Sequence, residues 1–122
     1  MSEVLYTVAE ANALLPYLAP TLVELREKYE LAEAARANVA RAAVGNGWSE
    51  KRERWSATMA RVAELVERLE EWGIQLRDLS TGLVDFPALR LDEEVFLCWR
   101  LGEPEVAWYH PRDEGFGSRS PL

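Results

Sequence analysis

Cysteine and histidine are almost absent from this sequence. Its 122 residues include one cysteine and one histidine, Cys98 and His110. A single cysteine excludes an internal disulfide bond, and zinc sites usually draw on more cysteines and histidines than this chain contains. At this length folding buries about two-thirds of the surface that the unfolded chain exposes, so one hydrophobic core can stabilise the domain without a disulfide or a structural metal.

Long apolar runs and basic tracts are absent as well. No stretch approaches the roughly 18 consecutive apolar residues of a membrane-spanning helix, and the opening residues Met1–Thr7 lack the positive region and apolar run of a secretory signal. Acidic residues outnumber basic ones by 21 to 14, and the net charge of −7 gives the surface the wrong sign for nucleic acids or anionic lipids. We therefore expect an acidic cytoplasmic protein that binds neither nucleic acid nor membranes.

Apolar residues are plentiful, at 48% of the chain, which suits one small folded domain. We expect this domain to span residues 1–122 and to belong to the α+β class. The pattern divides it into a helix at 7–44, a second helix at 48–72, a small antiparallel β-meander of three to four strands at 74–110, and a tail at 111–122.

The first predicted helix begins with a capping box. Thr7 is followed three residues later by Glu10, so that the hydroxyl and the carboxylate can satisfy two unpaired amide groups. One apolar stripe then recurs in steps of three and four: Ala11, Leu15, Leu18, Leu22, Leu25, Tyr29 and Ala32. Pro16 and Pro20 interrupt the hydrogen bonding of this helix, so we expect either a kink or a break into two collinear pieces. The segment Gly45–Asn46–Gly47 should end the helix and turn the chain.

The second predicted helix carries a wide apolar arc. Its stripe is widened on one edge by Leu65 and Trp72: Trp48, Trp55, Met59, Val62, Val66 and Leu69. Because the connection to the first helix is short, the two should pack antiparallel as a hairpin. The arc is wider than one neighbouring helix covers, so we expect Leu65 and Trp72 to lack cover within the protomer.

The remainder of the chain changes to strand-like patterns, at residues 73–78, 83–88, 94–101 and 105–110. A four-residue loop at 102–105 would place Trp99 opposite Trp108, Cys98 opposite Tyr109 and Leu97 opposite His110.

A similar turn at 90–93 would place Asp85 opposite Cys98 and diagonal to Arg100. The strand at 95–100 is apolar on both faces, so both should be covered. We expect the helical hairpin on one face and a second subunit on the other. The tail should lie along the sheet, anchored by Phe116.

Four segments carry a family resemblance. They are Thr-Val-Ala-Glu-Ala-Asn-Ala-Leu-Leu-Pro at 7–16, Thr-Gly-Leu-Val-Asp-Phe-Pro at 81–87, Leu-Cys-Trp-Arg-Leu-Gly-Glu-Pro-Glu at 97–105, and His110 with Asp-Glu-Gly-Phe at 113–116. With these motifs the chain resembles the bacterial family called domain of unknown function 2203, over nearly its whole length. The resemblance implies a small stand-alone bacterial protein and carries no activity with it.

A candidate metal site lies near the end of the chain. His110 is followed at three and four residues by Asp113 and Glu114, so a strand end and loop could give one nitrogen and two oxygens to a divalent ion. The alternative is that the two acids are solvated loop residues. Asp85 should point to the opposite face of the sheet from His110, and Cys98 should be a buried inert thiol because the histidine faces away from it.

A candidate anion site involves Asp85, Arg100 and Arg119. In the expected register Asp85 and Arg100 are neighbours across strands and could form a structural ion pair. Alternatively, Arg100 and Arg119 could together receive a small anion, because the guanidinium fork suits carboxylate or phosphate.

The function that we expect follows from the excess apolar surface of the two predicted helices. Exposed surface of this kind normally marks an interface, so we expect a non-enzymatic interaction module, a homodimer in which helical hairpins associate into a bundle. The partner that we expect is a second copy of the chain. The competing hypothesis is a small-anion or divalent-metal site at the C-terminal hairpin and tail.

Overall fold

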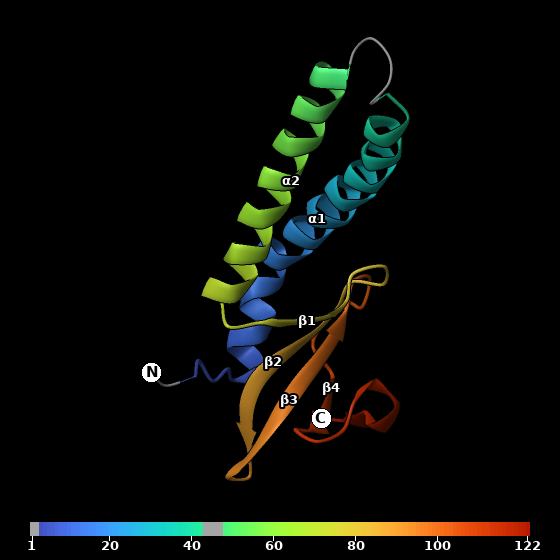
Figure 1. The fold of residues 1–122 in the computed structure, drawn as a ribbon. Coiled ribbons are helices and arrows are strands. Elements are labelled where there is room, and N and C mark those ends of the chain that lie inside the picture. The colour runs from blue at the N-terminus through green and yellow to red at the C-terminus, as the bar shows by residue number, and fades with distance from the viewer. Residues whose placement is uncertain (1–2, 43–47) are drawn as a thin grey trace.

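The computed structural model describes residues 3–42 and 48–122. Two helices, α1 (Val8–Ala42) and α2 (Trp48–Glu71), form a long hairpin that stands on one face of a small sheet (Figure 1). The strands follow in the order β1 (Gln75–Asp78), β2 (Leu83–Arg90), β3 (Glu93–Arg100), β4 (Trp108–Pro111) and β5 (Ser120–Pro121). Every neighbouring pair is antiparallel, which confirms the α+β hairpin and meander. The sheet has one strand more than expected, because the tail contributes β5 beside β4.

Helix α1 begins as its sequence predicts. The Thr7 amide donates to Glu10 Oε1 at 2.9 Å, and the Glu10 amide donates to Thr7 Oγ1 at 3.1 Å, which completes the capping box. The helix continues through Pro16 and Pro20 as one element, so the expected break does not occur. The predicted turn at 45–47 lies outside the described residues. Neither helix combines the length and apolar content that crossing a membrane requires, among the residues described.

The core lies where the hairpin meets the sheet, and most of the predicted α1 stripe is buried there. On α2 the buried face differs from the expected one. Leu65, expected at an uncovered edge, is fully buried, whereas Val66, expected in the stripe, is 36% exposed. Trp72 is half-buried against the core, and its carbonyl accepts a hydrogen bond from the Tyr6 hydroxyl. The expectation that these edge residues lack cover is therefore wrong for Leu65. The buried face of α2 is formed by Val62, Leu65 and Leu69.

The sheet separates the molecule into two layers. Its upper face carries apolar side chains into the core beneath the helices: Val84, Phe86, Ala88, Val95, Leu97 and Trp99. Its lower face is covered by the C-terminal segment, where Arg112 lies 4.4 Å from the centre of the Phe96 ring and Arg119 lies 5.1 Å from that of Trp108. The chain thus covers with its own tail the face for which a second subunit was expected.

The β2–β3 register agrees with the prediction, since Asp85 pairs with Cys98. The β3–β4 register is shifted by one residue, with Phe96 opposite His110, Leu97 opposite Tyr109 and Cys98 opposite Trp108. The cause is the longer connection between these strands. Val106 does not join β4 but is buried, and its amide donates to Asn12 Oδ1 at 2.7 Å. Because side chains alternate along a strand, this shift moves His110 to the opposite face of the sheet from the one expected.

Candidate metal centre

Three potential metal ligands meet on the lower face of the sheet. Asp85 on β2, Cys98 on β3 and His110 on β4 offer a carboxylate oxygen, a sulfur and a ring nitrogen that all lie within 4.8 Å of one another. All three residues are buried, with exposed fractions of 2% or less. The pairing registers of β2–β3 and β3–β4 explain why these three side chains lie together. Asp85 pairs with Cys98, and His110 pairs with Phe96, two residues along β3 and therefore on the same face.

The hydrogen bonds of His110 define how its ring is oriented. Nδ1 lies 2.8 Å from the Pro111 carbonyl oxygen and Nε2 lies 3.0 Å from Asp85 Oδ1. A carbonyl oxygen only accepts, so Nδ1 carries a hydrogen and donates it. Nε2 then faces a carboxylate oxygen, and the two atoms can share one positively charged occupant, either a proton or a metal ion.

Arg77 holds the other oxygen of the same carboxylate. Its Nε donates to Asp85 Oδ2 at 2.7 Å, and its guanidinium lies over the Phe96 ring at 5.0 Å. Arg77 was not among the predicted site residues. It lies on β1 at the irregularity in the β1–β2 pairing, between Leu76 and Asp78. A basic residue on the strand beside a buried acid was the available signal, but the irregular pairing concealed its position.

Within the described part of the chain, Cys98 has no base that could activate it as a nucleophile. Burial, with a smaller contribution from the Asp85 charge, raises the pKa of the thiol to about 11. Both ring nitrogens of His110 are already engaged, by Pro111 and by Asp85. The arrangement therefore does not form a nucleophile–base pair, and the thiol is buried, as predicted.

Arg119 lies on the other side of Cys98. Its Nη2 donates to Glu103 Oε1 at 2.7 Å and to the Cys98 carbonyl oxygen at 3.3 Å, while Phe116 lies 4.6 Å from the guanidinium. Its Nε is buried and has no hydrogen-bond partner among the residues that the structure describes. The guanidinium is also close enough to the thiol to oppose the rise in the pKa of Cys98. Arg119 thus places positive charge near the thiol of Cys98.

The sequence-predicted site residues are only partly brought together. Asp113 and Glu114 are exposed and line the same cavity as His110, but they do not belong to the buried trio. Asp85 pairs with Arg77 and His110 instead of Arg100. The Arg100 guanidinium lies over the Phe116 ring at 5.5 Å, and Arg119 lies over the same ring at 4.6 Å and pairs with Glu103.

The trio borders a cavity of about 320 Å³ that opens to solvent beneath the sheet. Besides the trio, its lining includes two arginines, two carboxylates and two apolar residues: Arg77, Arg112, Asp113, Glu114, Leu83 and Phe116. A small molecule could therefore reach the buried ligands.

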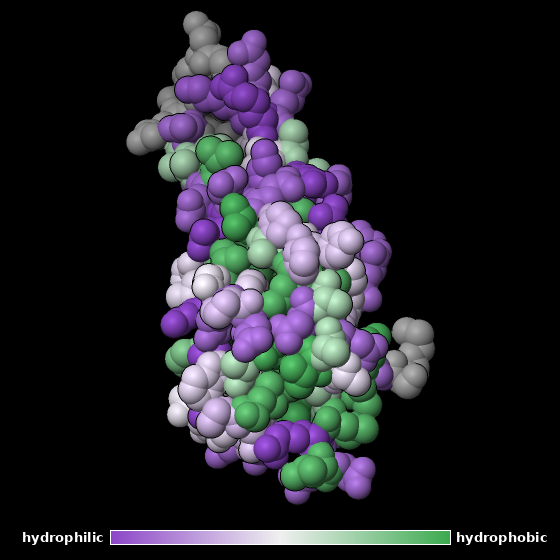
Figure 2. Space-filling view, turned by 180° about the vertical axis from the view of Figure 1, so that it is seen from behind, coloured by the Kyte–Doolittle hydropathy of each residue, from purple (hydrophilic) through white to green (hydrophobic). Residues whose placement is uncertain are grey.

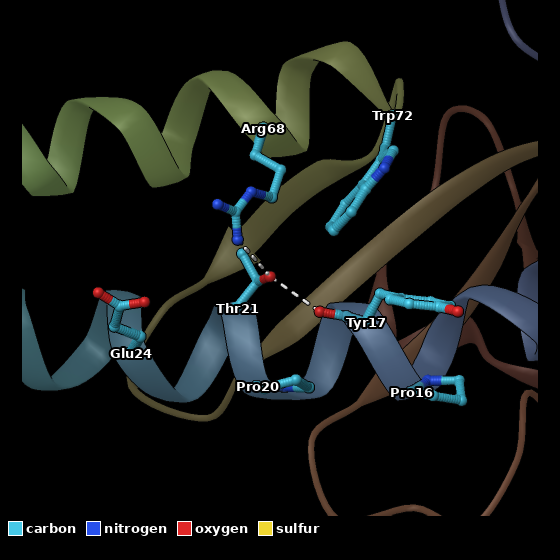
Figure 3. A pocket seen from close by; sticks show the side chains of 7 residues that line it. All are labelled: Pro16, Tyr17, Pro20, Thr21, Glu24, Arg68 and Trp72. Carbon is cyan, nitrogen blue, oxygen red and sulfur yellow. Dashed lines mark hydrogen bonds between the residues drawn. The ribbon is translucent and has the colours of Figure 1, made fainter.

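A second cavity, of about 390 Å³, lies between the helices (Figure 3). Its polar groups are occupied by helix contacts, because Thr21 donates to the Tyr17 carbonyl at 2.8 Å and Arg68 reaches Thr21 Oγ1 at 3.4 Å. The aromatic ring of Trp72 points into the space above Tyr17 (Figure 3). We find no group of potential metal ligands among the residues that line this cavity.

No curated protein and no solved structure matches the chain. A family model described as "Uncharacterized conserved protein (DUF2203)" matches residues 4–122. The match covers the motifs from the capping box of α1 to the tail that closes the lower face of the sheet. The chain therefore belongs to the DUF2203 family of uncharacterized conserved proteins.

Proposed function

We propose that this protein binds a divalent transition metal ion of the zinc class through Asp85, Cys98 and His110. The observation that carries the proposal is the buried group of three different donor types within 4.8 Å. Sulfur and imidazole nitrogen favour zinc and its neighbours over magnesium or calcium, which prefer oxygen ligands alone. This proposal keeps His110 from the predicted metal set and replaces Asp113 and Glu114 with Asp85 and Cys98.

The orientation of His110 supports the proposal. Metal-binding histidines commonly donate the hydrogen of their second nitrogen to a carbonyl or carboxylate, which fixes the ring and its tautomer. The Nδ1 contact with the Pro111 carbonyl has this form. The ion would take the place of the proton between Nε2 and Asp85 Oδ1, while Arg77 continues to hold Oδ2.

The surroundings of Cys98 support a thiolate ligand. A zinc-class ion deprotonates a coordinating thiol despite its raised pKa. The sulfur that results would accept a hydrogen bond, and the buried Nε of Arg119 is a donor that has no partner within residues 3–42 and 48–122. Three protein ligands leave a fourth position open, as in zinc sites that also bind water or a small molecule. The adjoining cavity gives this position access to solvent.

Cobalt(II) titration of the chelator-treated chain tests the proposal. We expect one ion per chain and a near-ultraviolet thiolate-to-cobalt charge-transfer band. The band should be absent in Cys98→Ser, and binding should weaken by at least about tenfold in His110→Gln. Asp113→Asn and Glu114→Gln are matched controls that line the same cavity and should bind cobalt normally.

Failure of the wild-type chain to bind cobalt or zinc would overturn the proposal, and so would an unchanged spectrum in Cys98→Ser. Circular dichroism of each variant establishes that it is folded. Elemental analysis of protein purified without chelator then identifies the ion that is acquired during expression.

Self-association into a homodimeric interaction module is the second candidate. Burial of Leu65 removes much of the reason for joining the helical hairpins. A different surface supports association, because apolar residues gather at the sheet end while the far end of the hairpin is largely hydrophilic (Figure 2). Leu89 and Leu91 are 54% and 84% exposed at this end. Sedimentation at micromolar concentration should give a dimer that Leu91→Asp dissociates, and a wild-type monomer would exclude this candidate.

A further inference from the structure

We infer that the open position of the metal centre takes a small monocarboxylate, held between the ion and the guanidinium of Arg77. This inference rests on the proposed metal site and names the class of ligand that completes it. It depends on three features of the cavity beneath the sheet: one available guanidinium edge, one occupied arginine beside it, and a rim that is negatively charged.

The guanidinium of Arg77 is fixed in place but only partly used. Its Nε donates to Asp85 Oδ2 at 2.7 Å, and the Phe96 ring lies 5.0 Å away. Among the described residues, no hydrogen bond engages its two terminal nitrogens. The side chain is 42% exposed and lines the cavity. An arginine held by one side and open on the other presents two parallel donors, which is the geometry that a carboxylate accepts.

Arg112 lines the same cavity and has no such capacity. Its Nε donates to the Val95 carbonyl at 3.1 Å, and its Nη1 and Nη2 donate to Glu3 at 3.2 and 2.9 Å. It also lies over the Phe96 ring, at 4.4 Å. The two arginines therefore share a location and an aromatic neighbour, and they differ in whether their terminal nitrogens are free. Arg112 is the matched control for Arg77.

The residues that line the cavity favour a ligand of low negative charge and small size. Asp113 and Glu114 are exposed carboxylates at the cavity, and they disfavour a ligand with a second negative charge. Leu83 and Phe116 supply apolar surface for a short hydrocarbon group. The cavity volume of about 320 Å³ limits the ligand to a small molecule. A monocarboxylate with a short neutral chain fits these conditions better than phosphate or a dicarboxylate.

The cobalt-loaded full-length chain provides the test, with sodium propionate and inorganic phosphate as probes. Propionate should change the visible cobalt absorption in a saturable way, and phosphate should require a higher concentration for the same change. Arg77→Gln should weaken propionate binding by about tenfold or more, because it removes charge-assisted hydrogen bonds. Arg112→Gln should leave propionate binding within about twofold of the wild type.

Removing the rim charges is an independent test that does not alter Arg77. The double variant Asp113→Asn with Glu114→Gln should improve phosphate binding relative to propionate. This variant decides the matter if Arg77→Gln cannot be loaded with cobalt, because Arg77 also positions Asp85.

The possible failures are distinguishable. If the wild-type chain takes up no cobalt, the metal proposal itself is wrong. If cobalt binds through Cys98 but propionate leaves the spectrum unchanged, the carboxylate inference alone is wrong. Equal weakening by Arg77→Gln and Arg112→Gln, or phosphate binding as tight as propionate binding, would also overturn it.

Discussion

Nε2 of His110 lies 3.0 Å from Oδ1 of Asp85, and both side chains are 2% exposed. Two ionisable groups are thus placed in contact inside a domain of 122 residues. Each side chain has one further hydrogen-bond contact, Asp85 with Arg77 at 2.7 Å and His110 with the Pro111 carbonyl at 2.8 Å. The stability of the lower layer and the proposed metal chemistry both depend on this pair.

Breaking the pair should strongly destabilise the metal-free protein. We expect Asp85→Ala to lower the free energy of unfolding by about 3 kcal/mol, because it leaves His110 buried without its partner. Adding His110→Ala to that variant should cost less than His110→Ala costs alone. Urea denaturation of the two single variants and the double variant measures this coupling. Additive effects within about 0.5 kcal/mol would contradict it.

The Cys98 thiol should make the metal-free protein less stable in alkali. Its pKa rises from the usual 9.0 to about 11 in the folded state because the thiol is buried. Well below pH 9 the thiol is protonated in both states and its stabilising contribution is complete. Between about pH 9 and 11 the unfolded chain loses this proton while the folded chain retains it, so stability falls.

Comparison with Cys98→Ala isolates this effect from other groups that titrate in alkali. The difference in unfolding free energy between the wild type and Cys98→Ala should shrink by about 1–2 kcal/mol from pH 8.5 to pH 11. Thermal or urea unfolding with a chelator present measures it. A difference that does not change with pH would show that the thiol ionises equally in both states.

Two adjacent positions can test which face of α2 is buried. Leu65 is fully buried, so Leu65→Ala should cost about 2–5 kcal/mol through lost burial and the resulting cavity. Val66 is 36% exposed, so Val66→Ala should cost less than about 1 kcal/mol. Urea denaturation compares the two directly, and a larger effect at Val66 would restore the stripe expected from the sequence.

The turn between β2 and β3 carries removable backbone strain. Leu91 and Asp92 have φ angles of +51° and +65°, a region that asparagine and glycine adopt more readily than leucine and aspartate. Leu91→Asn with Asp92→Gly should therefore raise the unfolding free energy by about 1 kcal/mol, as tight hairpin turns favour this pair. Leu89→Asn is the exposed control and should leave stability nearly unchanged. A loss of stability in the double variant would contradict the strain.

Local signals in the sequence were sufficient for most of the fold. The Thr7–Glu10 capping box forms as predicted, because its two hydrogen bonds join residues three positions apart. The pairing of Asp85 with Cys98 was also predicted correctly. The structure uses a tight turn at 91–92 where a longer one was expected, but both turns are symmetric about the same point and give the same register.

The candidate site was harder to predict, because it depends on whether the loop between β3 and β4 shifts the strand register by one residue. A one-residue difference in the β3–β4 register separates His110 facing Asp85 from His110 facing away. The Val106 amide contributes to that difference by donating to Asn12, 94 positions earlier in the chain. The sequence-based prediction therefore grouped His110 with Asp113 and Glu114, which are close in sequence. In the structure the carboxylate next to His110 is that of Asp85.

The sequence by itself determined the two helices, the meander and the order of the elements, since capping and periodicity act over a few residues. Only the tertiary structure decided which face of α2 is buried and which side chains surround His110. These outcomes depend on contacts between distant segments, in which a shift of one residue along a strand or a part-turn of a helix exchanges the buried and exposed sets.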